Sequence, residues 1–247
     1  SEARARAAYL SEIELTVEGG EVTAFSGELI EVTDDIERDP TASRIINDYR
    51  AEVSLDSPVV ETETPLNATF GANYHRETGY GNLITDAMRE RVDADAAITN
   101  AGGIRSDAVY GPGEITGGDI FNTLPFPNTV ISLELTGEEL VETLESQVIT
   151  LESDTGQSFG EEISQQTSGL RFEWVPHEDA DGLVRDVYVG GEPLDPGETY
   201  EVAVNSFIAN GGSGYPLADK PVIEDTGELQ ATTVVNYLEG KETIAPS

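Results

Sequence analysis

The chain has 247 residues, enough to bury a sizeable core and to form one large domain or two small ones. It carries 48 acidic and 13 basic residues, for a net charge of −35, so it lacks the basic surface that nucleic-acid binding requires. It has no cysteine, which excludes disulfides and thiolate metal sites, and no apolar run reaches the length of a membrane span.

The acidic composition points to an environment of high salt. Only Lys220 and Lys241 are lysines, whereas carboxylates are abundant. At about 1 M salt the repulsion between such charges is screened within roughly 3 Å, so a chain of this kind stays compact there. We therefore expect a protein from a salt-adapted organism. The sequence begins at Ser1 without an initiator methionine, and we expect it to be a fragment of a longer protein.

The first elements form a small N-terminal group. Residues 9–17 and 22–32 alternate apolar and polar side chains around Gly19 and Gly20, a pattern that predicts a β-hairpin. A lone hairpin cannot bury both of its faces, so it must pack on something else. Asp39 followed by Pro40 then predicts the start of a helix that runs to about residue 53.

A larger unit begins near residue 58. A helix is expected to open at Gly81, a buried strand to cover 96–99, and another strand to cover 130–135. Thr136 and Glu139 have the spacing of a capping box for the next helix. Further strands are expected at 170–175, 183–189 and 200–204, a loop at 152–166 and a last helix at 228–239. This mixture predicts an α+β fold, with mixed β-sheets and helices on the outside.

Two glycine-rich segments, Asn100–Arg105 and Asn210–Tyr215, each follow a strand or near-strand. Glycines let the backbone turn sharply and approach a ligand closely, and Arg105 supplies a planar cation suited to phosphate or carboxylate. Each segment could be a simple turn, but two of the same kind suggest opposite sides of one cleft. Neither has the spacing of a P-loop or of a dinucleotide-binding loop.

Two aromatic residues stand beside these loops. Phe126 lies between two prolines, and Phe207 lies just before the second glycine segment. They could be core residues, or two rings that hold a flat base by stacking. The two histidines, His75 and His177, are far apart in sequence and fit surface positions better than a metal site. The residues by themselves indicate a binding cleft without a catalytic centre.

Four motifs taken together resemble the C-terminal domain of the 5′-nucleotidase family. They are Gly81–Met88, Asn100–Arg105, Leu124–Phe126 and Phe207–Tyr215, in family order, and the resemblance covers about residues 58–247. Residues 1–57 resemble the last strands and the connecting helix of the family's N-terminal metallophosphoesterase domain. We therefore expect a domain boundary between residues 57 and 58.

The resemblance also implies a binding site. Asn100 and Arg105 would contact the nucleotide, Phe126 and Phe207 would sandwich the base, and Asn128 would reach its polar edge. The implied substrate-binding residues are Arg76, Asn100, Gly102, Gly103, Arg105, Phe126, Asn128, Phe207, Asn210, Gly211, Gly212 and Ser213. Two positions depart from the family pattern. Ser213 stands where an aspartate commonly binds the ribose hydroxyls, and Tyr74 stands where an arginine is common, with Arg76 two residues later.

The resemblance implies the substrate-recognition part of a phosphoesterase that hydrolyses nucleoside 5′-phosphates at the cell surface or outside the cell. Two divalent metal ions of the zinc, manganese or magnesium type would sit in the N-terminal domain, the expected partner of this chain, which alone would be inactive. The alternatives are a UDP-sugar hydrolase, a cyclic-nucleotide phosphodiesterase or a nuclease of the same superfamily, and a stand-alone nucleotide-binding module.

The net charge makes a direct prediction about stability. Self-repulsion should destabilise the compact state when screening weakens, so the melting midpoint should fall as salt is lowered from about 1 M to about 0.05 M. Circular dichroism melts across this range would measure the change. A midpoint that does not move with salt would contradict the expected salt adaptation.

Overall fold

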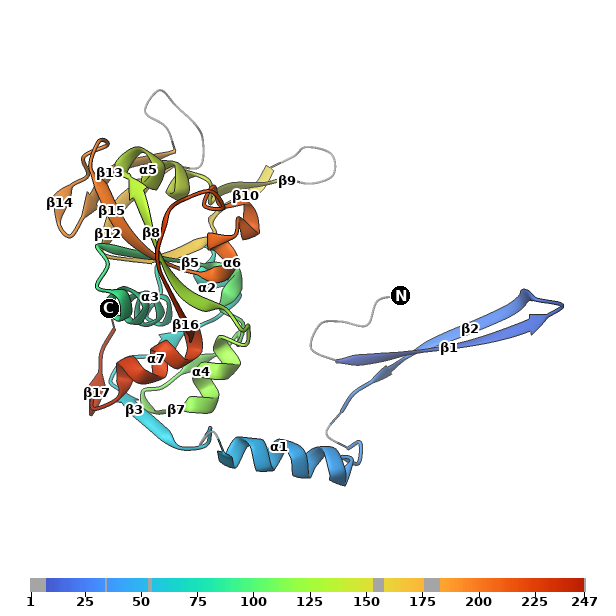
Figure 1. Cartoon of the computed structure of the whole chain (residues 1–247). Coiled ribbons are helices and arrows are strands. Elements are labelled where there is room, and N and C mark those ends of the chain that lie inside the picture. The colour runs from blue at the N-terminus through green and yellow to red at the C-terminus, as the bar shows by residue number, and fades with distance from the viewer. Residues whose placement is uncertain (1–7, 34, 53–54, 153–157, 176–182, 247) are drawn as a thin grey trace. The chain divides into compact units, whose positions relative to one another are not determined.

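The structure is a computed structural model that describes residues 8–33, 35–52, 55–152, 158–175 and 183–246. It contains two compact units, residues 1–53 and residues 54–247 (Figure 1). The predicted domain boundary, between residues 57 and 58, lies four residues beyond this division.

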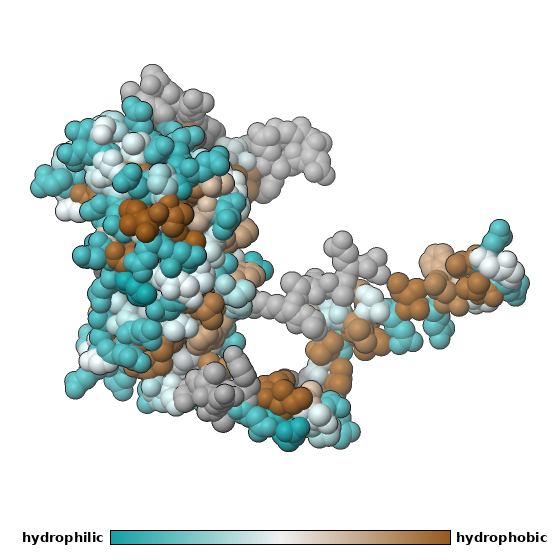
Figure 2. Space-filling model, viewed as in Figure 1, coloured by the Kyte–Doolittle hydropathy of each residue, from teal (hydrophilic) through white to brown (hydrophobic). Residues whose placement is uncertain are grey.

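The first unit contains the predicted hairpin. Strands β1 (Tyr9–Glu18) and β2 (Glu21–Glu31) pair antiparallel, and Gly19 and Gly20 make the turn with φ values of 62° and 91°. Leu15 lies opposite Phe25 on an apolar face that stays open, with Phe25 81% exposed. The hydrophobic residues of this hairpin form a continuous brown band in Figure 2. The hairpin prediction is confirmed, and no described residue of this unit covers its apolar face.

Helix α1 (Pro40–Glu52) completes the first unit and begins where the sequence predicts. The Asp39 side chain accepts a hydrogen bond from the backbone N–H of Ala42 at 2.8 Å, which satisfies one of the free donors at the helix start. Ile45 and Ile46 are both more than half exposed.

The second unit is built on a five-stranded mixed sheet. Its order is β11 (Gln165–Ser168), β5 (Ala96–Asn100), β15 (Thr199–Asn205), β8 (Thr129–Thr136) and β16 (Val222–Leu229). The two strands β5 and β15 run parallel, and every other neighbouring pair is antiparallel.

Successive side chains of a strand point to opposite faces of a sheet, and each face of this sheet packs against a buried core. On one face Ala97 and Ala203 pack in the same core as Leu83 of α3 (Gly79–Val92) and residues of α7 (Gln230–Leu238). On the other face Ile98 and Val204 share a core with residues of α5 (Gly137–Glu145). The prediction of an α+β fold with helices outside mixed sheets is confirmed.

Capping boxes fix two helix starts beside the sheet. Thr136 and Glu139 form the predicted box at α5, and Thr116 and Asp119 form another at α4 (Gly117–Thr123). Lys220 Nζ lies 2.7 Å from a Glu139 carboxylate oxygen. The hydrogen bond from Lys220, together with that from the Thr136 backbone, lowers the pKa of Glu139.

One sequence prediction is wrong. The polar stretch 152–166 was expected to be a loop, but β9 (Val148–Glu152) and β10 (Ser158–Ile163) pair as a hairpin and β11 follows. The polar side chains Gln165, Gln166 and Ser168 of β11 are buried, so hydropathy does not mark this strand. The intervening residues 153–157 lie outside the described part of the chain.

Smaller sheets and helices complete the second unit. They are β3 (Pro58–Thr62), β7 (Gly113–Thr116) and β17 (Thr243–Ile244) in one sheet, β4 (Leu66–Asn67) and β6 (Val109–Tyr110) in another, β12 (Leu170–Trp174), β13 (Val184–Val189) and β14 (Glu192–Pro193) in a third, and helices α2 (Phe70–Asn73) and α6 (Ser206–Ala209). Within the described ranges, no helix is both long and apolar enough to cross a membrane.

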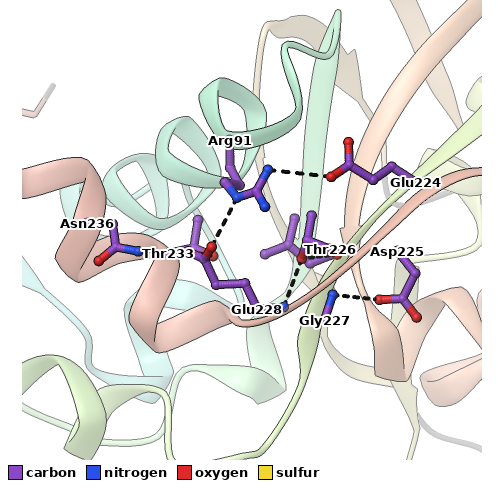
Figure 3. Close-up of polar contacts among 9 residues, drawn as sticks. Arg91, Glu224, Asp225, Thr226, Gly227, Glu228, Thr233 and Asn236 are labelled. Atoms are coloured by element: carbon purple, nitrogen blue, oxygen red, sulfur yellow. Dashed lines mark hydrogen bonds and ion pairs between the residues drawn. The ribbon is translucent and has the colours of Figure 1, made fainter.

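An ion-pair network fixes the junction between the edge strand β16 and helix α7 (Figure 3). Arg91 of α3 lies 3.5 Å from Glu224 and 3.1 Å from Glu228. The second carboxylate oxygen of Glu228 accepts hydrogen bonds from Thr233 and Asn236 of α7. Helix α3 is thereby tied to the edge strand β16 and to helix α7.

Close packing around Gly137 predicts a measurable effect. An added Cβ there would lie 2.2 Å from the Asp195 carbonyl oxygen and 2.8 Å from Pro196 Cα, both backbone atoms. Gly137→Ala should therefore destabilise the chain by about 1–3 kcal/mol through overpacking. Thermal melts at high salt would measure it.

Gly71→Ala is the matched control, because it also lies in a helix but has no atom within 4 Å of the added carbon. It should leave stability unchanged or raise it by up to about 1 kcal/mol. Equal melting midpoints for the two variants would contradict the packing argument.

Candidate functional site

Three loops meet the central sheet at the same end of its strands. The parallel strands β5 and β15 end there at Asn100 and Asn205, because parallel strands have their carboxyl ends at one edge. Strand β8 runs antiparallel to β15 and starts beside its end, where Val130 pairs with Asn205. The segments that follow Asn100, precede Thr129 and follow Asn205 therefore converge at this edge.

The side chain of Asn205 holds two of these loops together. Its amide nitrogen donates to Asn100 Oδ1 at 3.0 Å and to Thr99 Oγ1 at 3.1 Å. Its amide oxygen accepts from the backbone N–H of Ile208 at 3.1 Å and so caps α6. Asn205 is fully buried, so these bonds are not exchanged for bonds to water.

A pocket of about 220 Å³ opens where the loops meet. Phe126 and Phe207 both line it and are 46% and 44% exposed, so each ring keeps a free face. The complete lining is Asn100, Gly102, Gly103, Phe126, Asn128, Phe207 and Ser213. The two rings are therefore not core residues on opposite sides of the domain.

The second glycine loop is shaped to fit beneath one ring. A Cβ at Gly212 would lie 2.6 Å from ring carbons of Phe207 and from its carbonyl oxygen, so only glycine fits without displacing the ring. Gly211 has a φ of 81°, a left-handed conformation that glycine adopts without strain. Gly212 therefore supports the Phe207 ring, and neither glycine appears in the pocket lining.

Asn128 is held by its backbone, and its side chain is left for other partners. Its carbonyl accepts from the N–H of Gln230 at 2.8 Å, and the next residue, Thr129, donates its N–H to Ser206 Oγ at 3.0 Å. Among the described residues the Asn128 amide group makes no hydrogen bond. It can present one donor and one acceptor together, the combination that reads an adenine edge.

Arg105 is the last residue of the first glycine-rich segment and contacts its neighbours outside the pocket. Its backbone N–H donates to the Thr123 carbonyl at 2.8 Å, and its guanidinium lies 5.1 Å from the centre of the Phe70 ring. The Tyr74 hydroxyl lies 2.9 Å from where a Gly102 Cβ would be. Burial and the charge of Glu162 raise the pKa of Tyr74, and the charge of Arg105 acts against them. A cation and a neutral phenol thus stand near the loop that carries Gly102.

The structure does not bring every predicted site residue into the pocket. Arg76 lines a separate hollow with Gln165, Arg171 and Trp174. The Asn210 side chain donates to the Ser206 carbonyl at 2.6 Å, and this bond closes the short helix α6. Of the twelve predicted residues, seven line the pocket; the five that do not are Arg76, Arg105, Asn210, Gly211 and Gly212.

Two residues that organise the site were not predicted from the sequence. Asn205 carries the bridging amide, and Gln230 donates its N–H to Asn128 and its side-chain amide to Thr99. A signal existed for Asn205, because asparagine is one of the residues preferred at helix N-caps. Gln230 has no local signal, since its partners lie more than a hundred residues away.

Comparison with known proteins identifies the family of this chain. The family model described as 5′-nucleotidase, C-terminal domain matches residues 58–220, about two thirds of the chain. Protein UshA of Escherichia coli is 30% identical over 191 residues, which are 77% of this chain and 32% of that protein. Endonuclease YhcR of Bacillus subtilis is 30% identical over 227 residues, which are 90% of this chain and 18% of that protein.

A solved structure shows the same likeness. The 5′-nucleotidase precursor of Thermus thermophilus is 29% identical, with a TM-score of 0.66 over 96% of this chain and 50% of that one. This chain spans about a third or less of the two curated relatives and half of the solved one. The resemblance inferred from the four sequence motifs is confirmed, and the chain belongs to the 5′-nucleotidase C-terminal domain family.

Proposed function

We propose that this chain is the substrate-recognition part of a 5′-nucleotidase-like phosphoesterase and that its pocket binds the nucleoside of a nucleoside 5′-phosphate. The observation that carries the proposal is the pair of half-exposed rings, Phe126 and Phe207, on one pocket at one edge of the sheet. Aromatic faces of this kind bind a flat base by offset stacking. The free amide of Asn128 supplies the polar contact to the edge of the base.

The phosphate would lie on the side of Arg105. Its guanidinium is the cation that accompanies the first glycine loop, and a planar guanidinium binds phosphate oxygens in pairs. Arg105 is not a lining residue of the pocket itself, so its role is with the part of the ligand that extends out of the pocket. Ring stacking inside and a cation outside match the two chemical halves of a nucleotide.

The hydrolytic step belongs to another part of the parent protein in this proposal. Among the described residues, no three His, Cys, Asp or Glu side chains gather as a metal site would require. The residues present therefore do not fit the two divalent ions that the family resemblance implies, and we assign those ions to an N-terminal metallophosphoesterase domain. That domain is the proposed partner, residues 1–57 are its proposed last part, and an extracellular or cell-surface location follows by resemblance.

A nuclease is the second candidate for the parent activity. It is favoured by the likeness to a protein named endonuclease YhcR, which extends over 90% of this chain. The same base pocket would serve either reaction, because a nucleoside 5′-phosphate and the end of a nucleic-acid strand share the base. Phosphate release from AMP by the full-length parent protein, compared with cleavage of single-stranded DNA, would separate the two.

The first test concerns catalysis. The purified chain, incubated with AMP and Mn²⁺ at about 1 M salt, should release no phosphate above buffer, because the described residues form no metal site. A characterised 5′-nucleotidase in the same assay controls for detection. Turnover that rises with the concentration of this chain would contradict the division of roles proposed here.

The second test concerns the two rings. Phe126→Ala and Phe207→Ala should each weaken adenosine binding by about 1–3 kcal/mol, the range for base–aromatic stacking, as measured by isothermal titration calorimetry. Both side chains are nearly half exposed, so the melting midpoint should change little. Phe25→Ala, on the exposed face of the hairpin, is the matched control and should leave adenosine binding unchanged.

The opposite pattern would contradict this assignment. If either pocket variant bound adenosine as well as the parent chain, the ring would not stack on the base. If both lowered the melting midpoint by many degrees before affecting binding, the rings would be structural.

A further inference from the structure

A second hollow of the larger unit has a positive lining. Its volume is about 220 Å³, and its charged lining residues are Arg76, Arg171 and Glu77. Two arginines against one glutamate leave the lining with an excess of positive charge, in a chain whose net charge is −35. A hollow whose charge is opposite to that of the surrounding surface concentrates anions.

Both arginines are available to a ligand. Among the described residues neither forms an ion pair, although the chain has 48 acidic and 13 basic side chains. The Arg171 guanidinium lies 3.8 Å from the centre of the Tyr188 ring. Stacking holds a guanidinium by its flat face and leaves the N–H groups at its edge to bind carboxylate or phosphate oxygens. The Glu77 carboxylate already accepts a hydrogen bond from Asn82 Nδ2.

A buried glutamine fixes the segment that carries Arg76 against strand β11. The Gln166 side chain donates to the carbonyls of Asn73 and Arg76 at 2.8 and 2.9 Å. It also accepts from the N–H of Thr78 at 3.0 Å. Gln166 is 2% exposed, so these bonds are not exchanged for bonds to water. The backbone of Arg76 is therefore held in place by the core of the unit.

Two aromatic rings and an unpaired buried acceptor complete the hollow. Phe172 and Trp174 line it, and both also pack against the core on one face of the sheet. Gln165 lines it as well and is 4% exposed; its amide nitrogen donates to the Leu144 carbonyl at 3.1 Å. Its amide oxygen is buried and has no donor among the described residues. Buried acceptors normally have a donor, and a hydroxyl or N–H group of a bound ligand would supply one.

We infer that this hollow is a second binding site, for a compact anion made of one flat ring with a carboxylate or phosphate group. Arg76 and Arg171 bind the anionic oxygens, and the Trp174 ring stacks on the ligand. The volume is below the range of about 300–1,000 Å³ for drug-sized ligands, which limits the occupant to a small molecule. The inference does not depend on nucleoside binding, because the two linings share no residue.

The chain has a single tryptophan, Trp174, which makes the test direct. Titration of the purified chain with benzoate or phenyl phosphate at about 1 M salt should change the Trp174 fluorescence saturably. For at least one of the two probes the dissociation constant should be about 10 mM or tighter. The probe that binds identifies carboxylate or phosphate as the preferred group. Benzamide, which is neutral and shaped like benzoate, should bind at least about tenfold more weakly than that probe.

Two variants test the role of the arginines. Arg76→Gln and Arg171→Gln should each weaken binding of the probe at least about tenfold, because each removes hydrogen bonds between charged groups. Both side chains are exposed, so the melting midpoint should change little. Arg44→Gln is the matched control, because it removes one positive charge from an exposed position on α1 of the other unit. It should leave the dissociation constant within about twofold of the parent value.

The inference is overturned if neither probe changes the Trp174 fluorescence, if benzamide binds as tightly as the anions, or if the two arginine variants bind like Arg44→Gln. Adenosine should not displace the bound probe. Displacement would place the probe in the pocket lined by Phe126 and Phe207 and would also overturn the inference. Failure of adenosine to bind at all would instead contradict the proposed function and leave this second site intact.

Discussion

The candidate site depends on one buried amide. Asn205 ends a strand that runs parallel to β5 and antiparallel to β8, so its side chain lies where the pocket loops converge. It donates twice, to Asn100 and Thr99, and accepts once, from the N–H of Ile208. Leaving such a buried group unpaired costs about 1–3 kcal/mol, so the loops are held in one arrangement before any ligand arrives. A site that is already ordered does not lose that ordering free energy on binding.

Glycine completes the arrangement by letting side chains pack against the loop backbone. A Cβ at Gly103 would lie 3.2 Å from Asn100 Oδ1, and one at Gly102 would lie 2.9 Å from the Tyr74 hydroxyl. A Cβ at Gly212 would meet the Phe207 ring. The glycines thus have different purposes on the two sides of the pocket. Gly102 and Gly103 line the pocket with their backbone. Gly212 instead packs against the Phe207 ring, which lines the pocket.

The sequence predicted those parts of the site that have a local sequence signal. The glycine pairs and the two loop aromatics mark Gly102, Gly103, Phe126 and Phe207, which line one pocket. It could not place Arg76, which lines another hollow, because no local pattern reports which hollow a loop residue faces. The strands within the predicted loop 152–166 were also missed, because β11 buries the polar side chains of Gln165 and Gln166 and lacks the apolar alternation that marks a half-buried strand.

The charge of the chain gives a reason for the chemistry of the pocket. At a net charge of −35, the surface as a whole repels an anionic nucleotide at ordinary salt, and the repulsion extends for about 10 Å at 0.1 M. An acidic chain can still recognise such a ligand if it reads the uncharged base and keeps carboxylates away from the phosphates. An uncharged lining that includes both rings meets the first condition, and the Arg105 guanidinium places a cation on the side proposed for the phosphate. The absence of a carboxylate in the described lining is consistent with this constraint, because a negative charge inside the pocket would add to the repulsion that the net charge of the chain already exerts.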